Sequence, residues 1–260
     1  MLFMADTAAA AQFTALGPDE SLDDGRLADF YSYPEALDRC WVRGNMIASI
    51  DGAATAAGKA GGLAGPGDRN LFMLMRYAAD VILVGAETVR VENYSGAQVP
   101  LSHRDARQRR GQAEVPPIAV VTRSGNLDPE ARFFTRTDVA PLILTSADAV
   151  DDTRRRLGGV AEVLNVSGPR SDEADAATIL AVLAERGLLR VLSEGGPLVL
   201  NMLIAAGLLD ELCLTVAPIL VGGGAGRIAA GPAESLIRMR RAHVLSDEHG
   251  YLYTRYVRGD

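Results

Sequence analysis

The stretch from Ala79 to Arg90 constrains the fold of this chain most, because a short apolar run ends there in a glycine and a polar turn. The run, Val81 to Val84, is uninterrupted, which is typical of a strand buried on both faces between helices and not of an amphipathic helix. Gly85 ends the run and the next residues can open a helix, which leaves backbone N–H groups and the Thr88 hydroxyl free at the carboxyl end of a strand. In an open α/β sheet this edge binds anions and nucleotides; the alternative is an ordinary strand-to-helix turn.

Composition narrows the class of protein. A chain of 260 residues with 48% apolar residues can bury a large core, and we expect one domain over residues 25–260. A net charge of -7, with only 7 Tyr, 6 Phe and 1 Trp, argues against nucleic-acid binding. Two cysteines, Cys40 and Cys213, and three scattered histidines offer neither a disulfide framework nor metal-ligand spacing, so no metal site is expected.

The beginning of the chain carries no targeting signal. Residues 1–24 mix Ala, Thr, Gly and acidic residues without a sustained period, which predicts a mobile tail. No Lys or Arg precedes Arg26 and no long apolar run is present, so neither a signal peptide nor a membrane span is predicted. Together with the low cysteine count, this makes the cytoplasm the expected location.

Further along, strand and helix patterns alternate, which favours a parallel sheet. Strands are predicted at Trp41 to Ile50, Ile118 to Thr122, Leu142 to Thr145, near Val163, Leu189 to Leu192 and Glu211 to Pro218, with an antiparallel finish that includes Tyr251 to Val257. Helices are predicted at Leu27 to Tyr33, from Asp68 as N-cap to about Ala79, at Asp148 to Leu157, at Ala174 to Arg186 and after Pro197. The hydrophilic segment Val91 to Val115 is expected to be a long surface excursion without a buried element.

Two further stretches are suited to ligand binding. Ala53 to Gly67 is almost wholly Ala, Gly, Thr and Pro, which cannot pack as a core element and lets backbone approach a ligand, so we expect an active-site loop. Ser193 to Pro197 contains two glycines that also permit close approach, and Pro197 fits the first turn of a helix. This second turn is another candidate anion-binding site.

Five motifs, in this order and spacing, resemble a known family. They are Ala48-Ser49-Ile50-Asp51-Gly52, Arg76 with Ala79 to Arg90, Ser193 to Pro197, Gly207 to Leu212, and Ala217 to Gly223. The chain from Trp41 to Gly250 resembles the reductase domain of riboflavin biosynthesis, the C-terminal half of bifunctional deaminase-reductases. The resemblance implies a dihydrofolate-reductase-like α/β fold, a three-layer sandwich with a mostly parallel central sheet and antiparallel C-terminal strands. It also implies a hydride transfer from NADPH to a pyrimidine ribosylamine.

The resemblance assigns cofactor-binding residues by position. Gly85 and Thr88 match the first cofactor turn, and the loop that holds the pyrophosphate is matched by Gly195, Gly196, Pro197 and Leu198. Arg123 and Ser124 lie at a strand end where dihydrofolate-reductase-like proteins hold the 2′-phosphate, and Thr145 ends the next strand. An arginine and a hydroxyl suit that dianion, whereas a solvated turn is the alternative for Arg123.

Substrate and proton-donor candidates are carboxylates and one arginine. Arg76 and Glu194 match substrate-contacting positions, the alternatives being a solvated helix charge and a helix N-terminal carboxylate. The acceptor also needs a proton, and with no histidine near a motif the candidates are Asp51, Asp68, Glu194 or water. We assign a catalytic role to Asp51 and Glu194. Asp68 either orients a pyrimidine or pterin ring, as a carboxylate does in dihydrofolate reductases, or caps its helix.

The sequence departs from the family pattern in three places. No His-x-Glu with Pro-Cys-x-x-Cys is present for a deaminase zinc, so the chain is expected to be a reductase only. Glu92 to Val99 replaces a segment with Asp, Pro and Leu-Thr-x-Arg, and Ala60 to Leu63 replaces a Ser-x-Trp-Ile element. Both changes remove groups that would hold a ribose phosphate.

Three functions therefore stay open: a flavin-pathway pyrimidine reductase, a reductase of dihydrofolate or another pterin, and a catalytically idle dimeric NADPH-binding protein. A homodimer is expected from the resemblance and from the apolar segment Leu212 to Val221, which would otherwise risk an exposed edge strand. The alternative for that segment is a buried central strand.

Overall fold

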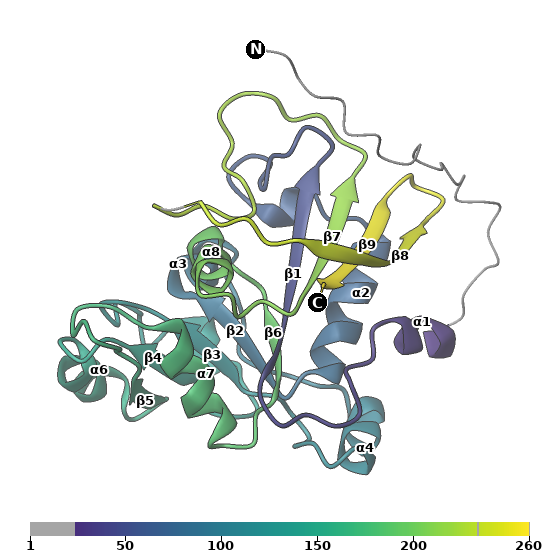
Figure 1. Cartoon of the computed structure of the whole chain (residues 1–260). Coiled ribbons are helices and arrows are strands. Elements are labelled where there is room, and N and C mark those ends of the chain that lie inside the picture. The colour runs from purple at the N-terminus through teal and green to yellow at the C-terminus, as the bar shows by residue number, and fades with distance from the viewer. Residues whose placement is uncertain (1–23, 233, 260) are drawn as a thin grey trace.

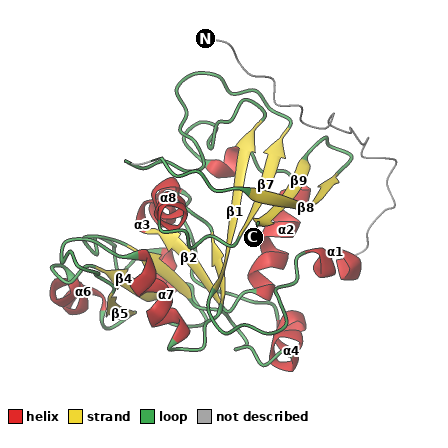
Figure 2. Ribbon diagram, in the orientation of Figure 1, coloured by secondary structure: helices red, strands yellow, loops and turns green. Residues whose placement is uncertain are grey.

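Nine strands form one mixed sheet in the computed structural model, which describes residues 24–259 except residue 233 (Figures 1 and 2). The strands are β1 (Trp41–Ser49), β2 (Val81–Gly85), β3 (Ile118–Val121), β4 (Leu142–Thr145), β5 (Glu162–Asn165), β6 (Arg190–Ser193), β7 (Glu211–Ala217), β8 (Met239–Ser246) and β9 (Leu252–Arg258). Their order is β5-β4-β3-β2-β6-β1-β7-β9-β8. All neighbours from β5 to β7 pair in parallel, whereas β9 runs antiparallel to both β7 and β8.

The helices lie on both faces of this sheet. They are α1 (Asp24–Phe30), α2 (Pro66–Ala78), α3 (Ala86–Val91), α4 (Leu101–Arg109), α5 (Arg132–Thr135), α6 (Val150–Leu157), α7 (Ala176–Ala184) and α8 (Pro197–Ala205), with a 3-10 turn η1 (Ala60–Gly62). Helices α2, α3, α5 and α6 pack into one apolar cluster, and α7 and α8 pack into a second. In the described part of the chain no helix is long and apolar enough to span a bilayer.

Strand β2 lies inside the sheet, between β3 and β6, and explains the three layers. Its side chains alternate, as strand geometry requires: Ile82 and Val84 enter the first cluster, and Val81 and Leu83 the second. All four are at most 2% exposed. The predicted α/β fold with a mostly parallel sheet and antiparallel C-terminal strands is therefore confirmed.

The predicted strands and helices are present with ends shifted by a few residues. The expected mobile tail, residues 1–24, lies outside the described residues except for Asp24, where α1 begins. Strand β7 pairs with β1 and β9, so the segment from Leu212 is not an edge strand, and that argument for a dimer was wrong. The edge beyond β9 is formed by β8, which the sequence pattern did not single out.

The interpretation of Val91 to Val115 as a surface excursion without a buried element was wrong. The segment contains α4, and the side chain of Arg107 in that helix is fully buried. Its guanidinium donates hydrogen bonds to the carbonyl oxygens of Tyr77, Ala79 and Ala113 at 2.7 to 2.9 Å, which satisfies carbonyls at the end of α2. Arg107, although charged, is thus buried and caps the C-terminal end of α2.

The N-cap interpretation of Asp68 was also wrong. Helix α2 begins at Pro66, with Gly65 as its N-cap, and no side chain caps it. Proline fits the first helical position because its missing N–H is not needed there. Asp68 instead lies in the first turn, where its carboxylate is free to face the site described below.

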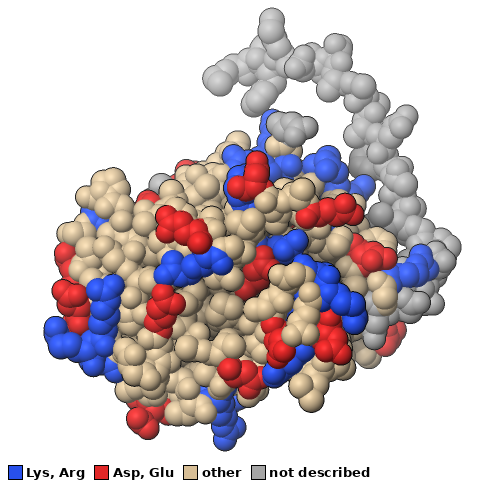
Figure 3. Space-filling model, turned by 90° about the horizontal axis from the view of Figure 1, so that it is seen from below, with Lys and Arg blue, Asp and Glu red and all other residues tan. Residues whose placement is uncertain are grey.

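Ion pairs in this protein differ sharply in burial. On the face shown in Figure 3, basic and acidic side chains are interspersed, and exposed pairs of this kind contribute little to stability. By contrast, Arg43 and Glu211 form a pair with both side chains 0% exposed, and Arg255 donates to the same carboxylate at 2.9 Å. The two arginines also donate to the carbonyls of Phe30 and Tyr31, so this triad holds the segment after α1 against β1, β7 and β9.

Replacing Glu211 by Gln is expected to lower the free energy of unfolding by about 3 to 5 kcal/mol, because Arg43 would remain buried without a counter-charge. Glu162→Gln, which breaks an exposed pair with Arg186, is the matched control and should cost less than about 1 kcal/mol. Urea denaturation of both variants measures the difference. Equal, small effects would show that the triad does not stabilise the fold.

The same triad predicts acid sensitivity. Burial alone would raise the pKa of Glu211, but Arg43 and Arg255 outweigh it and hold the pKa below its ordinary value. The stabilisation is therefore present above the ordinary carboxyl pKa and is lost as the pH falls through the lowered, folded-state pKa.

Candidate active site

The parallel strands bring most of the predicted site residues to one edge of the sheet. Strands β1, β2, β3, β4 and β6 all point the same way, so the residues after their carboxyl ends face one another. These residues are Asp51 after β1, Gly85 and Thr88 after β2, Arg123 and Ser124 after β3, Thr145 at the end of β4, and Glu194 to Leu198 after β6.

A cavity of about 330 Å³ opens at this edge. It is lined by Asn45, Met46, Ile47, Ala54, Ala60, Gly61, Ala64, Asp68, Arg69, Phe72, Thr88, Glu92, Tyr94 and Glu194. Three predicted residues, Asp68, Thr88 and Glu194, thus share one cavity. Its wall includes residues 54–64 of the predicted active-site loop, and Glu92 holds that loop by accepting a hydrogen bond from the backbone N–H of Ala60 at 2.7 Å.

At the floor of the cavity Glu194 forms a fixed assembly with Arg76 and Tyr94. The Arg76 guanidinium donates to both carboxylate oxygens of Glu194, each at 2.7 Å, in the bidentate geometry that arginine favours. The Tyr94 hydroxyl donates to the same carboxylate at 2.8 Å. Because the Glu194 side chain is only 2% exposed and that of Arg76 16%, Arg76 is not a solvated helix charge.

The protonation states of the assembly follow from these contacts. Burial alone would lower the pKa of Arg76, but the Glu194 carboxylate raises it, so the guanidinium stays charged. Burial and the Glu194 charge raise the pKa of the Tyr94 hydroxyl well above its ordinary value, so the hydroxyl keeps its proton and donates it in a hydrogen bond. The assembly therefore presents to the cavity a carboxylate that accepts three hydrogen bonds, two from Arg76 and one from Tyr94.

Asp68 is the less constrained carboxylate. It lies half-buried in the first turn of α2, near Thr215 of β7. Burial raises the pKa of Asp68, while Thr215 and Arg69 counteract part of that effect. A carboxylate with free acceptor capacity in a cavity suits a ring that offers two N–H donors.

The two glycine turns lie against each other. The backbone N–H of Gly85 donates to the carbonyl of Gly195 at 2.7 Å. A Cβ on Gly196 would lie 2.6 Å from the Thr88 hydroxyl oxygen, and Gly195 has a φ of +79°, so both positions require glycine. In the described chain neither α3 nor α8 has a side-chain cap, which leaves their first N–H groups available beside this contact.

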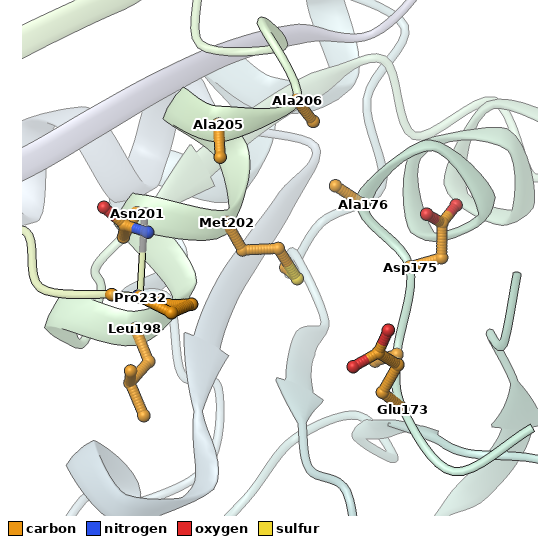
Figure 4. A pocket seen from close by; sticks show the side chains of 11 residues that line it. Glu173, Asp175, Ala176, Leu198, Asn201, Met202, Ala205, Ala206 and Pro232 are labelled. Atoms are coloured by element: carbon orange, nitrogen blue, oxygen red, sulfur yellow. The ribbon is translucent and has the colours of Figure 1, made fainter. Parts of the chain in front are cut away.

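On the other side of the turn a second cleft of about 340 Å³ runs between α8 and the start of α7 (Figure 4). Leu198 and Met202 point into it from α8, and Glu173 and Asp175 lie opposite, before α7. Pro232 closes one side. The glycine turn thus lies between the two spaces. Thr88 and Glu194 line the first cavity, and Leu198 lines the cleft.

Three cofactor candidates lie further along the edge. Arg123 and Ser124 are exposed after β3, and the Arg123 charge acts on Asp172, close to Glu173 at the rim of the cleft. Thr145 is fully buried, and its hydroxyl oxygen has no hydrogen-bond partner among the described residues. Thr145 therefore faces the interior and not the solvent.

Asp51 lies apart from both cavities. Its exposed carboxylate accepts hydrogen bonds from the Ser49 hydroxyl and from the backbone N–H groups of Val221 and Gly222, the latter at 2.7 Å. These donors lower the pKa of Asp51 to about 2, with Ser49 contributing most. An acid this strong holds no proton to donate at neutral pH, so the geometry does not favour Asp51 as the proton donor.

The chain was compared with known proteins. The model of the RibD C-terminal domain matches residues 40–253. This chain belongs to that family. The resemblance to the reductase domain of riboflavin biosynthesis is therefore confirmed, and the chain is an oxidoreductase by family.

Named relatives agree with this assignment. A 2,5-diamino-6-ribosylamino-4(3H)-pyrimidinone 5′-phosphate reductase of Archaeoglobus fulgidus is 29% identical over 186 residues, 71% of this chain and 83% of the relative. Riboflavin biosynthesis protein RibD of Bacillus amyloliquefaciens is 30% identical over 185 residues, 70% of this chain but only 47% of that protein. A pyrimidine reductase-like protein from Corynebacterium diphtheriae superposes with a TM-score of 0.76 at 25% identity, over 85% of this chain and 92% of the other.

The sequence did not point to Glu92 and Tyr94, which line the cavity, or to Thr215, which lies near Asp68. Tyr94 and Glu92 lie in the segment that departs from the family pattern, so the departure itself was a signal that new side chains enter the site there. Thr215 carried no local signal, because a threonine in a strand is ordinary and its partner Asp68 is distant in sequence.

Tyr94→Phe is expected to lower the free energy of unfolding by about 1.5 to 3 kcal/mol, the range for a hydrogen bond to a charged group. The variant keeps the ring and removes only the donor to Glu194. Tyr77→Phe, at a ring stacked on His103, is the control and should change stability little. Thermal and urea unfolding measure both; a neutral Tyr94→Phe would mean that Glu194 does not need this donor.

Proposed function

We propose that this protein is an NADPH-dependent reductase that transfers a hydride to a pyrimidine ribosylamine of riboflavin biosynthesis. The observation that carries the proposal is the glycine turn, Gly195-Gly196, which lies between a cavity lined by carboxylates and a cleft with an apolar wall. A dinucleotide has the corresponding parts: a reactive ring, a pyrophosphate and a second base. The named relatives support the same reaction class.

The cofactor would lie across the turn. The N–H groups at the start of α8, with those of neighbouring α3, suit the pyrophosphate, because helix N-termini favour anions. The nicotinamide would enter the first cavity beside Thr88 and Glu194, and the adenine would rest against Leu198 and Met202. Arg123 would face the 2′-phosphate, which supports NADPH over NADH.

The chain's own residues bind, orient and exclude water. NADPH, when bound, supplies the hydride. Phe72, Met46 and Ala54 give the cavity apolar walls, and Glu92 keeps the loop at Ala60 closed against it. Asp68, with its raised pKa, is the side chain best suited to hold the ring and to exchange a proton with it.

The charges of the cavity indicate the substrate class. Three carboxylates line it, Asp68, Glu92 and Glu194, whereas Arg69 is its one cationic lining residue in the described chain. Arg76, which matches a substrate-contacting position of the family, is bonded to Glu194 and is not free to bind a phosphate. This supports a ring with N–H donors and weak binding of any ribose phosphate.

A second candidate function is reduction of dihydrofolate or another pterin. The pairing of Asp68 with Thr215 favours it, because a half-buried carboxylate can accept both N–H groups of an amino-pyrimidine edge, which pyrimidines and pterins share. The cavity alone does not separate the two rings.

Spectrophotometric NADPH oxidation against phosphorylated and unphosphorylated ribosylaminopyrimidines, dihydropterins and dihydrofolate tests the function. We expect turnover of a pyrimidine with little gain from its phosphate. Efficient turnover of only the phosphorylated compound, on the order of 10⁴ M⁻¹s⁻¹ or more, would contradict the weak phosphate site. No turnover despite tight NADPH binding would favour an idle binding protein.

Arg123→Ala should weaken NADPH binding by about ten-fold or more, because one charge-assisted contact to the 2′-phosphate is lost. NADH binding should change little. Arg109→Ala, an exposed arginine on α4, controls for the loss of one positive charge. Isothermal titration with both cofactors measures the effect, and equal losses for NADPH and NADH would remove Arg123 from the site.

Asp68→Asn should abolish a pH dependence of kcat/KM. In the wild type the ionised carboxylate accepts hydrogen bonds from the substrate, so kcat/KM should fall as the pH drops through the raised pKa of Asp68. The amide does not ionise, so the variant should have a low kcat/KM that does not change with pH over that range. Retention of the same acidic limb would assign the titration to another group.

We further propose a homodimer in the cytoplasm. On one face of β7 the side chains of Leu212, Leu214 and Val216 are half-exposed, while those between them are buried on the opposite face. Their neighbours on β9 include Tyr256 and the exposed Leu252. An apolar sheet face that helices leave partly open supports a contact with a second copy.

Leu214→Lys should convert the dimer into a 27.5 kDa monomer, because a charge at the centre of that face cannot be desolvated. Size-exclusion chromatography with light scattering at micromolar concentration measures the mass. A wild type that runs only as the monomer would refute the dimer; a dimeric Leu214→Lys would place the interface elsewhere.

A further inference from the structure

Asp51 fixes the start of the segment that follows β7. This segment, residues 218–232, is called the β7 arm below. The Asp51 carboxylate accepts hydrogen bonds from two backbone N–H groups at the start of the arm. In addition, the N–H of Ile50 donates a hydrogen bond to the carbonyl oxygen of Ile219 at 3.1 Å. The end of β1 and the start of the arm are therefore joined by three hydrogen bonds, two of them to one carboxylate.

The direction of the arm is set immediately after this junction. Gly222 and Gly223 have φ values of +65° and +68°, which side chains other than glycine rarely adopt. The Asp51 carboxylate receives the N–H of Gly222 at 2.7 Å, and so holds the first residue of that reversal. Figure 1 shows the arm rising from the end of β7 and descending toward α8.

The arm then touches the walls of both cavities. The carbonyl of Gly226 accepts a hydrogen bond from the N–H of Ala54, a wall residue of the first cavity, at 2.8 Å. Further on, the N–H of Ala230 donates to the carbonyl of Pro197 at 3.2 Å. Gly231 and Pro232 line the second cleft.

The fit of the arm on α8 is tight. A Cβ on Gly231 would lie 1.9 Å from the side-chain nitrogen of Asn201, so the arm backbone rests directly on that side chain. A displacement of the arm at its root would therefore alter the cleft wall at Gly231 and the support of Ala54 together.

We propose that Asp51 is a positioning residue that holds the β7 arm as the common outer wall of the two cavities. The inference rests on the proposed function, in which the bound cofactor extends across both cavities. Asp51 acts through the arm and does not touch the reacting atoms. Its lowered pKa fits this role, since the acceptor of two backbone N–H groups must stay ionised.

The test uses Asp51→Asn, which keeps the shape and removes the charge. Hydrogen exchange of the protein without cofactor should show faster exchange at Val221 and Gly222, by about ten-fold, since the charged acceptor is lost. The KM for NADPH should rise by about ten-fold, with kcat within about three-fold of wild type. Asp51→Glu, which restores the carboxylate, should recover part of both effects.

Asp105→Asn, an exposed aspartate on α4, controls for net charge and should change neither readout. Bound NADPH should also slow exchange in the arm of the wild type. Unchanged arm exchange in Asp51→Asn, or faster exchange with unchanged KM, would overturn the inference. A loss confined to kcat, together with a lost alkaline limb, would instead make Asp51 a proton donor.

The proposed function fails in a different way. A wild type that binds no NADPH would refute the cofactor assignment, and with it the positioning role. A wild type that binds NADPH, beside an Asp51→Asn variant that binds it equally well, refutes only the role of Asp51.

Discussion

The ion pair between Arg76 and Glu194 is the interaction on which the site depends. It ties helix α2 to the end of β6 through two hydrogen bonds of 2.7 Å, with one partner almost fully buried. Because Glu194 directly precedes Gly195, the same pair fixes the start of the glycine turn, Gly195-Gly196. Tyr94 adds a third donor from the segment after α3, so three elements meet on one carboxylate. Removal of either ion would leave its partner charged in a poorly solvated place, which is why we expect the pair to be structural as well as functional.

The same arrangement determines which charges of the cavity stay available to a ligand. A cation that pairs with a buried carboxylate is no longer available to a phosphate. In this chain Arg76 is used in that way, and the cavity that remains is rich in carboxylates. Under the proposed function, Asp68 accepts hydrogen bonds from the N–H groups of the ring. Tyr94, in the segment that departs from the family pattern, donates the third hydrogen bond to Glu194.

Much of the fold could be predicted from the sequence because its signals are local. The apolar run of β2 and the glycines of both turns depend on residues next to one another, and the structure places them as expected. The errors arose where a partner is distant in sequence. Arg107 looked hydrophilic because its three acceptor carbonyls could not be seen, and Asp68 looked like an N-cap although Pro66 already marked the first helical position. The partners of Asp51 on the β7 arm were invisible for the same reason.

A crystal structure of the protein with NADP⁺ tests the central claim most directly. The account predicts density for the nicotinamide in the cavity beside Thr88 and Glu194, for the pyrophosphate on the N–H groups at the start of α8, and for the adenine against Leu198 and Met202. The Arg76–Glu194 pair should be unchanged in that complex. A dinucleotide that leaves the glycine turn uncovered, or an Arg76 side chain that leaves Glu194 to bind a phosphate, would contradict it.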